Sequence, residues 1–207
     1  MKIGIAVWNL DVSGGTERQA LELAKQLRWM GHQVELYCAT FDSQRCFPEL
    51  VAELGPIHYL HGAHRQRSHS LSKIGFYWEM FAGRSRALAT LISSDLDVLN
   101  CHEYTTFWAG VYFQQRTGKP VVGMMNDLPS FRGVDHVRQQ PFHFAVSWAK
   151  RKLFAPAIQQ MNKIVVLDRI NQRRLQKLFG LDAVIIRSGL DLTRFPTPSK
   201  TLRKTSL

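Results

Sequence analysis

Residues 2–39 read KIGIAVWNLDVSGGTERQALELAKQLRWMGHQVELYCA and contain the pattern that decides the fold. The stretch opens with a short apolar run at residues 2–8, which is typical of a buried strand. A polar loop with paired glycines then leads into residues 16–30, where apolar side chains recur at helical spacing. A second apolar run at residues 33–39 predicts another strand. A strand, a helix and a strand in this order favour a parallel pair joined by a right-handed crossover.

The same alternation continues along the rest of the chain. Further strands are expected at residues 57–60, 97–101, 121–125, 163–167 and 183–186. Further helices are expected at residues 48–54, 71–92, 105–115 and 141–161, with an interruption before Pro156, and after the capping residue Asp168. Thr16 and Gln19 have the spacing of a capping box. The pattern predicts a doubly wound α/β domain, in which helices cover both faces of a mainly parallel, Rossmann-like sheet.

Length and composition exclude several classes of protein. The chain has 207 residues, of which 45% are hydrophobic and 21% charged, as in a globular domain rather than a disordered, collagenous or coiled-coil chain. No apolar run approaches the roughly 20 residues that span a bilayer. Three cysteines give no disulfide framework, so we expect a cytoplasmic protein, and two of the cysteines lie in strand-like contexts that are typical of buried thiols.

The net charge of +11 is unevenly distributed. Residues 1–127 hold 12 basic and 12 acidic side chains, whereas residues 128–207 hold 15 basic and 4 acidic ones. This asymmetry indicates an anionic partner: nucleic acid, a phosphorylated ligand, a membrane surface or an acidic domain. The alternative is that the charge serves solubility alone. Because the sequence has no RNP, KH or helix-turn-helix pattern, we expect no nucleic acid partner.

Basic residues and aromatic side chains alternate in two stretches, residues 65–86 and 142–154. Both could lie on an anionic membrane face. The alternative is an aromatic core stripe with solvated charges beside it.

Ligands of doubly wound domains bind beyond the carboxyl ends of the strands, where the strand-to-helix loops lie. Gly14 and Gly15 stand in the first of these loops, directly before a helix. Paired glycines allow backbone N–H groups to approach a ligand closely, and the helix dipole favours an anion there. The ligand expected there is phosphate or diphosphate, and the alternative is that the two glycines only form a turn. A G-x-G-x-x-G fingerprint and a P-loop are both absent, which argues against a dehydrogenase or a P-loop hydrolase.

Polar side chains follow two later strands. His102 beside Glu103 could bind sugar hydroxyls or move a proton, unless the imidazole is simply satisfied at a strand end. Asn126 and Asp127 could hydrogen-bond a ligand or cap a turn. Three histidines between residues 58 and 64 lack a neighbouring carboxylate, so no metal site is expected.

Five motifs stand in one order along nearly the whole chain: GGTERQALELAKQLRWMGHQVELYC, DVLNCHEY, PVVGMMNDLP, NKIVVLDRINQRRLQKLFG and VIIRSGLDLTRF. This order resembles the N-terminal domain of family 4 glycosyltransferases, which have the GT-B fold. The resemblance implies two Rossmann-like domains facing each other across a cleft. The N-terminal domain mainly receives the acceptor, and the C-terminal domain holds most of the nucleotide-sugar donor.

The resemblance also implies a reaction: a sugar, of the hexosyl type, passes from a nucleoside diphosphate to an acceptor hydroxyl with retention. It implies no metal and no cofactor, since the nucleotide-sugar is a co-substrate. Residues that match the donor diphosphate site are Gly14, Gly15 and Arg187. Residues that match the acceptor side are Glu17, Glu103 and Tyr104. Residues assigned to catalysis are His102, Asn126 and Asp127.

One departure from the family pattern affects the mechanism. Many members carry a His where this chain has Asn126, and an amide cannot take a proton. Asn126 can still hydrogen-bond a sugar, and Asp127 can orient the acceptor. The leaving phosphate can itself remove the acceptor proton.

A second departure concerns domain organisation. Residues 1–195 are expected to form the family's N-terminal domain and residues 196–207 a linker or tail, without the donor-binding domain and its E-x7-E motif. The expected partners are a nucleotide-sugar, a sugar or lipid-linked acceptor, a separate C-terminal domain or subunit and an anionic membrane. The protein would then be cytoplasmic and peripheral at the inner membrane face. The alternative is a non-catalytic module that binds sugar, phosphate or membrane.

Overall fold

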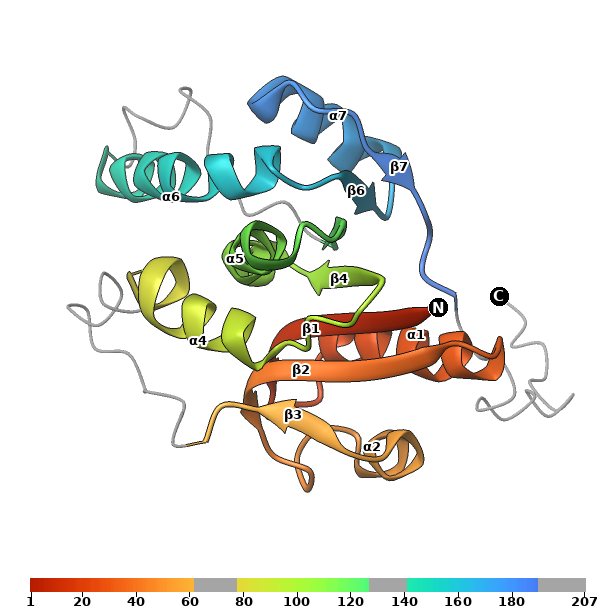
Figure 1. Cartoon of the computed structure of the whole chain (residues 1–207). Helices are drawn as coiled ribbons and strands as arrows, with labels where there is room; N and C mark the ends of the chain where they lie inside the picture. Colours follow the sequence, from red (N-terminus) through yellow and green to blue (C-terminus); the bar gives the residue numbers. More distant parts are fainter. Residues whose placement is uncertain (62–77, 127–140, 190–207) are drawn as a thin grey trace, which may run out of the picture.

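The structure is a computed structural model that describes residues 1–61, 78–126 and 141–189. In these residues, seven parallel strands form one sheet in the order β3-β2-β1-β4-β5-β6-β7 (Figure 1). The strands are β1 Lys2–Leu10, β2 Gln33–Phe41, β3 Ile57–Tyr59, β4 Val98–His102, β5 Val121–Met125, β6 Lys163–Val166 and β7 Val184–Ile185. The predicted doubly wound, parallel α/β class is confirmed.

Helices lie on both faces of the sheet. The α-helices are α1 Gly15–Trp29, α2 Pro48–Leu54, α4 Arg84–Leu91, α5 Phe107–Thr117, α6 Pro141–Gln159 and α7 Arg169–Phe179. A π-helical turn η1, Glu79–Gly83, precedes α4, and a 3-10 turn η2, Tyr104–Thr106, precedes α5. Helices α1 and α2 share one hydrophobic cluster with β1 and β2, whereas α4, α5, α6 and α7 contribute to the other.

Strand β1 divides these two clusters because its side chains alternate between the faces. Ile5 packs into the cluster of α1 and α2, and the next residue, Ala6, packs into the opposite one. Both are fully buried, as expected for a central parallel strand that is covered on both sides. All three cysteines are also buried and free, whereas the sequence predicts buried thiols for two of them.

Two local predictions are wrong. The capping box is absent, because Gly14 is the N-cap of α1 and no side chain caps it. The hydroxyl of Thr16 and the amide of Gln19 instead bond to other segments. Helix α6 is continuous through Pro156. Burial of Phe154 and Ala157 on either side of the proline stabilises the helix there.

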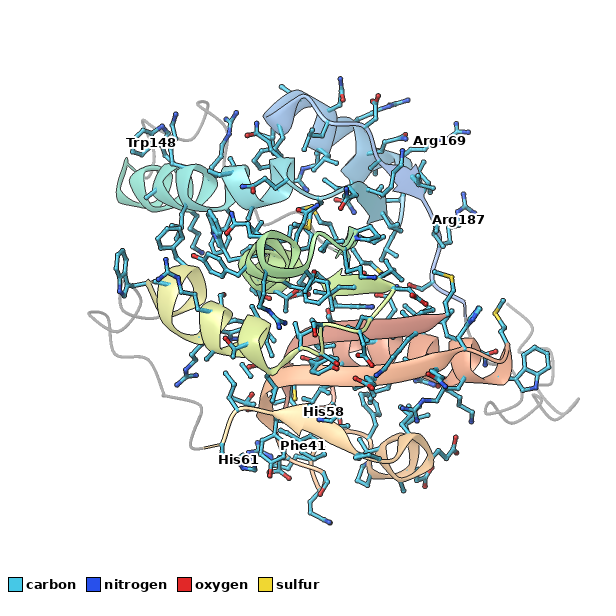
Figure 2. All side chains as sticks on the ribbon, viewed as in Figure 1. Phe41, His58, His61, Trp148, Arg169 and Arg187 are labelled. Atoms are coloured by element: carbon cyan, nitrogen blue, oxygen red, sulfur yellow. The ribbon has the colours of Figure 1, made fainter. Side chains whose placement is uncertain are left out.

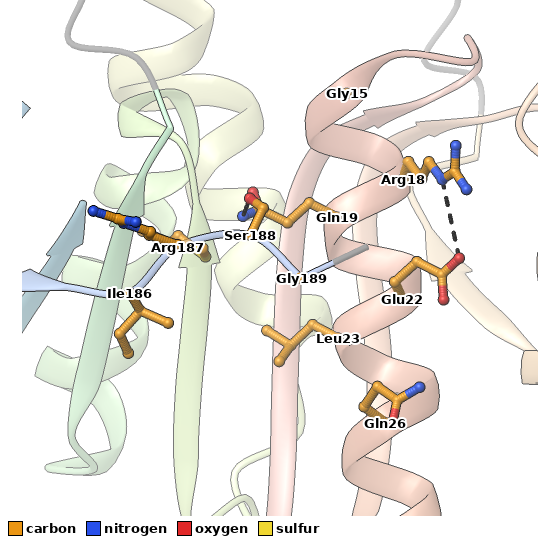
Figure 3. A pocket seen from close by; sticks show the side chains of 11 residues that line it. Gly15, Arg18, Gln19, Glu22, Leu23, Gln26, Ile186, Arg187, Ser188 and Gly189 are labelled. Atoms are coloured by element: carbon orange, nitrogen blue, oxygen red, sulfur yellow. Dashed lines mark hydrogen bonds and ion pairs between the residues drawn. The ribbon is translucent and has the colours of Figure 1, made fainter. Parts of the chain in front are cut away.

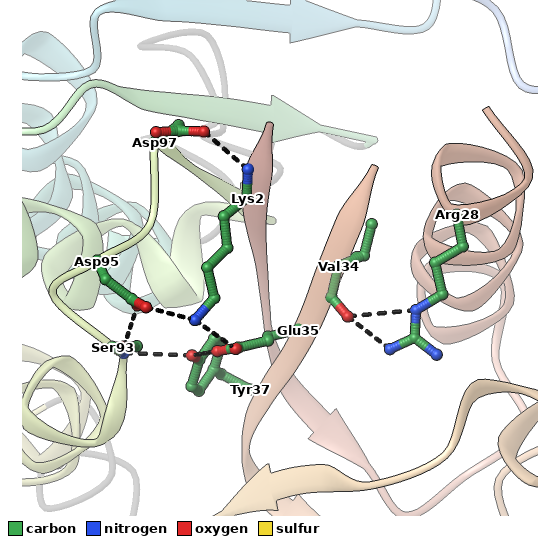
Figure 4. A network of polar contacts seen from close by, with 8 residues as sticks. All are labelled: Lys2, Arg28, Val34, Glu35, Tyr37, Ser93, Asp95 and Asp97. Carbon is green, nitrogen blue, oxygen red and sulfur yellow. Dashed lines mark hydrogen bonds and ion pairs between the residues drawn. The ribbon is translucent and has the colours of Figure 1, made fainter. Parts of the chain in front are cut away.

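A polar network joins three segments at the amino edge of the sheet (Figure 4). The ammonium of Lys2 lies 2.8 Å from Glu35 and 2.6 Å from Asp95. The backbone N–H of Lys2 also donates to the carboxylate of Asp97 at 2.7 Å. These contacts connect β1, β2 and the turn before β4, at the edge opposite to the strand-to-helix loops.

We predict that Gly123→Ala destabilises the fold. A Cβ at this position in β5 would lie 2.6 Å from Cζ of Phe107 and 3.0 Å from Cγ of Met161, both of which are buried. Overpacking of this kind typically costs about 1–3 kcal/mol of the free energy of unfolding, which urea titration measures. Gly15→Ala is the control, because a Cβ there meets nothing within 4 Å. An equal loss in both variants would contradict the packing argument.

Candidate functional site

The carboxyl ends of the central strands meet at one edge of the sheet. In the parallel register Val7 of β1 lies opposite His102 of β4, which in turn lies opposite Met124 of β5. The segments that follow these strands therefore lie together, beside the start of α1. This edge is where the sequence places most of its candidate residues.

Side chains from four segments form a hydrogen-bonded chain along this edge. The hydroxyl of Thr16, in the first turn of α1, donates to the carboxylate of Glu103 at 2.6 Å. The side-chain amide of Asn126 donates to the same hydroxyl at 3.4 Å. Asn171 of α7 donates to the backbone carbonyl of Asn126 at 3.4 Å. The predicted residues Glu103 and Asn126 are thus brought together, with Thr16 between them.

The paired glycines differ in their surroundings. Gly15 is open, because a Cβ added there would meet nothing within 4 Å. A Cβ on Gly14 would overlap Oε2 of Glu17, so this carboxylate lies over the N-cap of α1. Gly14 itself is extended, with φ −106° and ψ 172°, and a Cβ there would only require the flexible Glu17 side chain to move. The start of α1 therefore has one side open to a ligand and one side covered by a carboxylate.

The backbone at Glu103 has an unusual conformation, with φ 66° and ψ 153°. A non-glycine residue in such a region costs about 1–3 kcal/mol. The N–H of Glu103 donates to the carbonyl of Met124 at 2.8 Å, and the hydroxyl of Thr106 donates to the carbonyl of Glu103 at 2.9 Å. These bonds hold the turn after β4 in one geometry, which fixes where the Glu103 side chain begins.

His102 lies inside the protein rather than on the open edge. Its side chain is 0% exposed, and neither ring nitrogen has a hydrogen-bond partner among the described residues. Burial lowers the pKa of His102 to about 4, so the ring is neutral at pH 7. No solvent-exposed surface of the ring is available for proton exchange in this structure, and the catalytic role of His102 stays a prediction.

A groove of about 530 Å³ runs along α1 from the open glycine (Figure 3). One wall is the side of α1 from Gly15 to Gln26, and the other is the segment 186–189 that follows β7. Met124 of β5 also lines the groove. Gln19 donates to the hydroxyl of Ser188 across it at 2.7 Å. Two predicted diphosphate-binding residues, Gly15 and Arg187, therefore border the same groove.

The remaining predicted residues are less informative. Asp127 lies outside the described residues. The ring of Tyr104 packs edge-on against Phe154, with ring centroids 4.9 Å apart, so it contacts the core. Within residues 1–61, 78–126 and 141–189, no group of three or more His, Cys, Asp or Glu side chains could hold a metal ion.

Comparison with known families identifies the relatives of this fold. The family model for Glycosyltransferase Family 4 matches residues 13–194. The chain belongs to glycosyltransferase family 4. No curated protein sequence matches it.

Solved structures share the architecture at low sequence identity. Sucrose-phosphate synthase from Thermosynechococcus elongatus has a TM-score of 0.63 at 12% identity, over 93% of this chain and 49% of that one. The Anabaena protein HepE, solved with UDP and glucose, gives 0.56 at 18% identity, over 93% and 46%. The lipopolysaccharide outer core galactosyltransferase WaaB gives 0.53 at 13% identity, over 93% and 47%. The likeness shows the Rossmann-like fold of a GT-B half, and this chain spans about half the length of each neighbour.

Some residues at the edge of this family 4 domain were not predicted from the sequence. Thr16 was interpreted as a helix cap, although its hydroxyl bonds to Glu103. Asn171 and Ser188 were not singled out. The only signal for Asn171 is its place three residues after Asp168. The carboxylate of Asp168 accepts the backbone N–H of Asn171 at 2.7 Å and caps α7, as predicted.

We predict that His102 makes the fold sensitive to acid. Because burial holds its pKa near 4, below the ordinary 6.5, the unfolded chain binds a proton first as the pH falls. The stability conferred by the neutral ring is complete above about pH 6.5 and is lost progressively toward pH 4, by on the order of 3 kcal/mol. Urea unfolding at several pH values measures this loss. His102→Gln should flatten the pH dependence over this interval, and an unchanged slope would contradict the prediction.

Proposed function

We propose that this domain is the acceptor-side half of a retaining glycosyltransferase that takes its sugar from a nucleoside diphosphate. The family supplies the general activity of sugar transfer. The donor class is supported by the neighbour HepE, which was solved with UDP and glucose. The observation that carries the proposal is the groove where the open first turn of α1 and Arg187 lie together.

The first turn of α1 would bind the donor diphosphate. Backbone N–H groups in the first turn of a helix have no partner within the helix, and the helix dipole adds about half a positive charge there. Gly15 leaves room for an anion to reach these groups, and Arg187 adds a full positive charge from the other wall. Both would stabilise the negative charge that develops on the leaving diphosphate as the glycosidic bond breaks.

The acceptor hydroxyl would lie near Glu103 and Asn126. The amide group of Asn126 points its nitrogen at Thr16, while its buried Oδ1 has no hydrogen-bond partner among the described residues. In our proposal a sugar hydroxyl that reaches this buried oxygen donates a hydrogen bond to it, although the oxygen cannot take the proton away. In our proposal the leaving phosphate removes the acceptor proton, and Asp127, Glu17 and Tyr104 belong to the acceptor side.

Binding of most of the donor is assigned to a second domain. This chain spans about half the length of its structural neighbours, and the groove along α1 is open on one side to such a partner. A C-terminal domain or subunit would contribute the remaining contacts to the nucleotide. Charge neutralisation by amide groups and Arg187 would leave no step that requires a metal or a further cofactor.

A sugar or lipid-linked molecule is the proposed acceptor class. A lipid-linked acceptor would place the protein at an anionic membrane surface, as a peripheral protein on the inner face. No helix in the described segments has the length and apolar character needed to cross a membrane.

We predict that Gly15→Trp weakens binding of UDP by at least about tenfold, because an indole ring would fill the approach to the first turn of α1. Calorimetric titration of each variant with UDP measures the change in affinity. Gln115→Trp is the matched control, since Gln115 is exposed near the end of α5, at the opposite edge of the sheet. Equal affinity of the two variants would remove the diphosphate role of this turn.

We also predict that Thr16→Val lowers the rate of sugar transfer while Thr16→Ser restores it. Valine has nearly the shape of threonine but no hydroxyl, so Glu103 and Asn126 would lose the group that joins them. The expected loss of kcat is roughly tenfold, for a bond of about 1.5 kcal/mol in the transition state. Steady-state assays of the two-domain enzyme measure it. A Ser variant as slow as the Val variant would contradict the role of the hydroxyl.

A second candidate is a non-catalytic module that binds sugar or phosphate. One observation favours a module that binds an uncharged sugar: the Glu17 carboxylate covers Gly14 and opposes the binding of an anion there. Glu17→Gln distinguishes the two candidates. In a transferase it would alter turnover of sugar, whereas in a binding module it would only raise the affinity for phosphate.

A further inference from the structure

The layer formed by α6 and α7 carries most of the excess charge of the described residues. Between residues 148 and 189 the sequence has nine basic and two acidic side chains. The two acids are Asp168, which caps α7, and Asp182. Ion pairs among the described residues involve Lys2, Arg18 and Lys25, and the α7 cations Arg173, Arg174 and Lys177 take part in none of them.

Helix α7 presents a basic stripe to solvent. Ile170, Arg173, Arg174 and Lys177 are all exposed, and their spacing places them on one side of the helix. The opposite side is anchored, because Leu175 and Phe179 are buried in the core. Ile170 is 69% exposed between these cations, so an apolar side chain projects from the positive stripe.

Helix α6 extends the same surface. Trp148 is 55% exposed, and the ammonium of Lys152 lies 5.8 Å from the centre of its ring. Arg151 connects the two helices, since its guanidinium donates to the backbone carbonyl of Leu178 at 2.5 Å. In Figure 2, Trp148 lies at one end of this layer, while Arg169 and Arg187 project into solvent at the other end.

We propose that this surface, the exposed side chains of α7 together with Trp148 and Lys152 of α6, docks on an anionic lipid bilayer. Cations contribute attraction to acidic headgroups, and exposed isoleucine and tryptophan side chains insert at the level of the headgroups. Nucleic acid would be bound by the same cations, but it would gain little from an isolated aliphatic side chain. The combination of exposed cations with protruding apolar groups therefore favours a bilayer.

Docking on this surface would orient the candidate site relative to the bilayer. Arg169 begins α7 at the edge where Asn126 lies, and Arg187 borders the groove. From there the basic stripe extends along the 11 residues of α7, which is about 16 Å of helix. The bilayer would thus meet the protein beside the edge that holds the acceptor. That the bilayer lies beside the acceptor rests on the proposed function, whereas docking on the bilayer does not.

Vesicle flotation tests the proposal with the whole chain. The vesicles contain phosphatidylcholine alone or with about 30% phosphatidylglycerol. We expect binding to the anionic vesicles only, and its loss when salt is raised from about 0.1 to about 0.5 M. The triple variant Arg173→Glu, Arg174→Glu and Lys177→Glu should bind at least about 100-fold more weakly, and Ile170→Ser several-fold more weakly.

A matched triple variant tests whether binding depends on this surface or only on the net charge of the protein. Arg45→Glu, Lys119→Glu and Lys163→Glu change the charge equally at positions outside α6 and α7, and this variant should keep most of the binding. Replacement of the three α7 cations by Gln provides a milder second variant, and thermal unfolding checks that every variant is folded. Three results would overturn the proposal: no binding of the unmodified chain, equal binding to neutral vesicles, or equal losses in the two Glu triples. The α7 variants should bind UDP normally, so failure of docking and failure of the proposed transferase are distinguishable.

Discussion

Parallel pairing of the strands is the constraint on which the rest of the structure depends. Because every described strand runs in the same direction, the turns from β1 to α1, from β4 to α5 and from β6 to α7 lie at the carboxyl edge, where the helices begin with N–H groups that have no partner within the helix. The amino edge has a different role, since ion pairs around Lys2 connect its segments there. The chemistry that a domain of this kind can perform is therefore concentrated at one edge of the sheet.

Two carboxylates at this edge limit how an anion can bind. Glu17 covers the N-cap of α1, and Glu103 accepts the hydroxyl of Thr16 in the first turn. An arriving diphosphate would meet both negative charges as well as the helix dipole. Gly15 and Arg187 offer the approach that avoids them, along the groove between α1 and segment 186–189. In the proposed function this arrangement would separate a donor side along the groove from an acceptor side at Glu103 and Asn126.

The sequence predicts the sheet well because apolar runs and helical periodicity are local signals. All seven expected strands are present, and Asp168 caps its helix as expected. The contacts between distant segments could not be predicted in the same way. Thr16 and Glu103 are 87 residues apart, and nothing in the local pattern indicates that they meet. Burial of His102 also depends on the packing of neighbouring segments, so its place at a strand end left open whether the imidazole is accessible, and the structure buries it. Pro156 shows the same limit, because packing of α6 outweighs a local helix-breaking signal.

The central claim is that the backbone N–H groups at the start of α1 bind the diphosphate of an activated sugar. NMR titration of the ¹⁵N-labelled chain tests it most directly, with UDP in one series and uridine in the other. The account predicts that the amide resonances of Gly15 and Thr16 shift with UDP and stay in place with uridine. Shifts of the same size with both ligands, or none at these two amides while others respond to UDP, would contradict it.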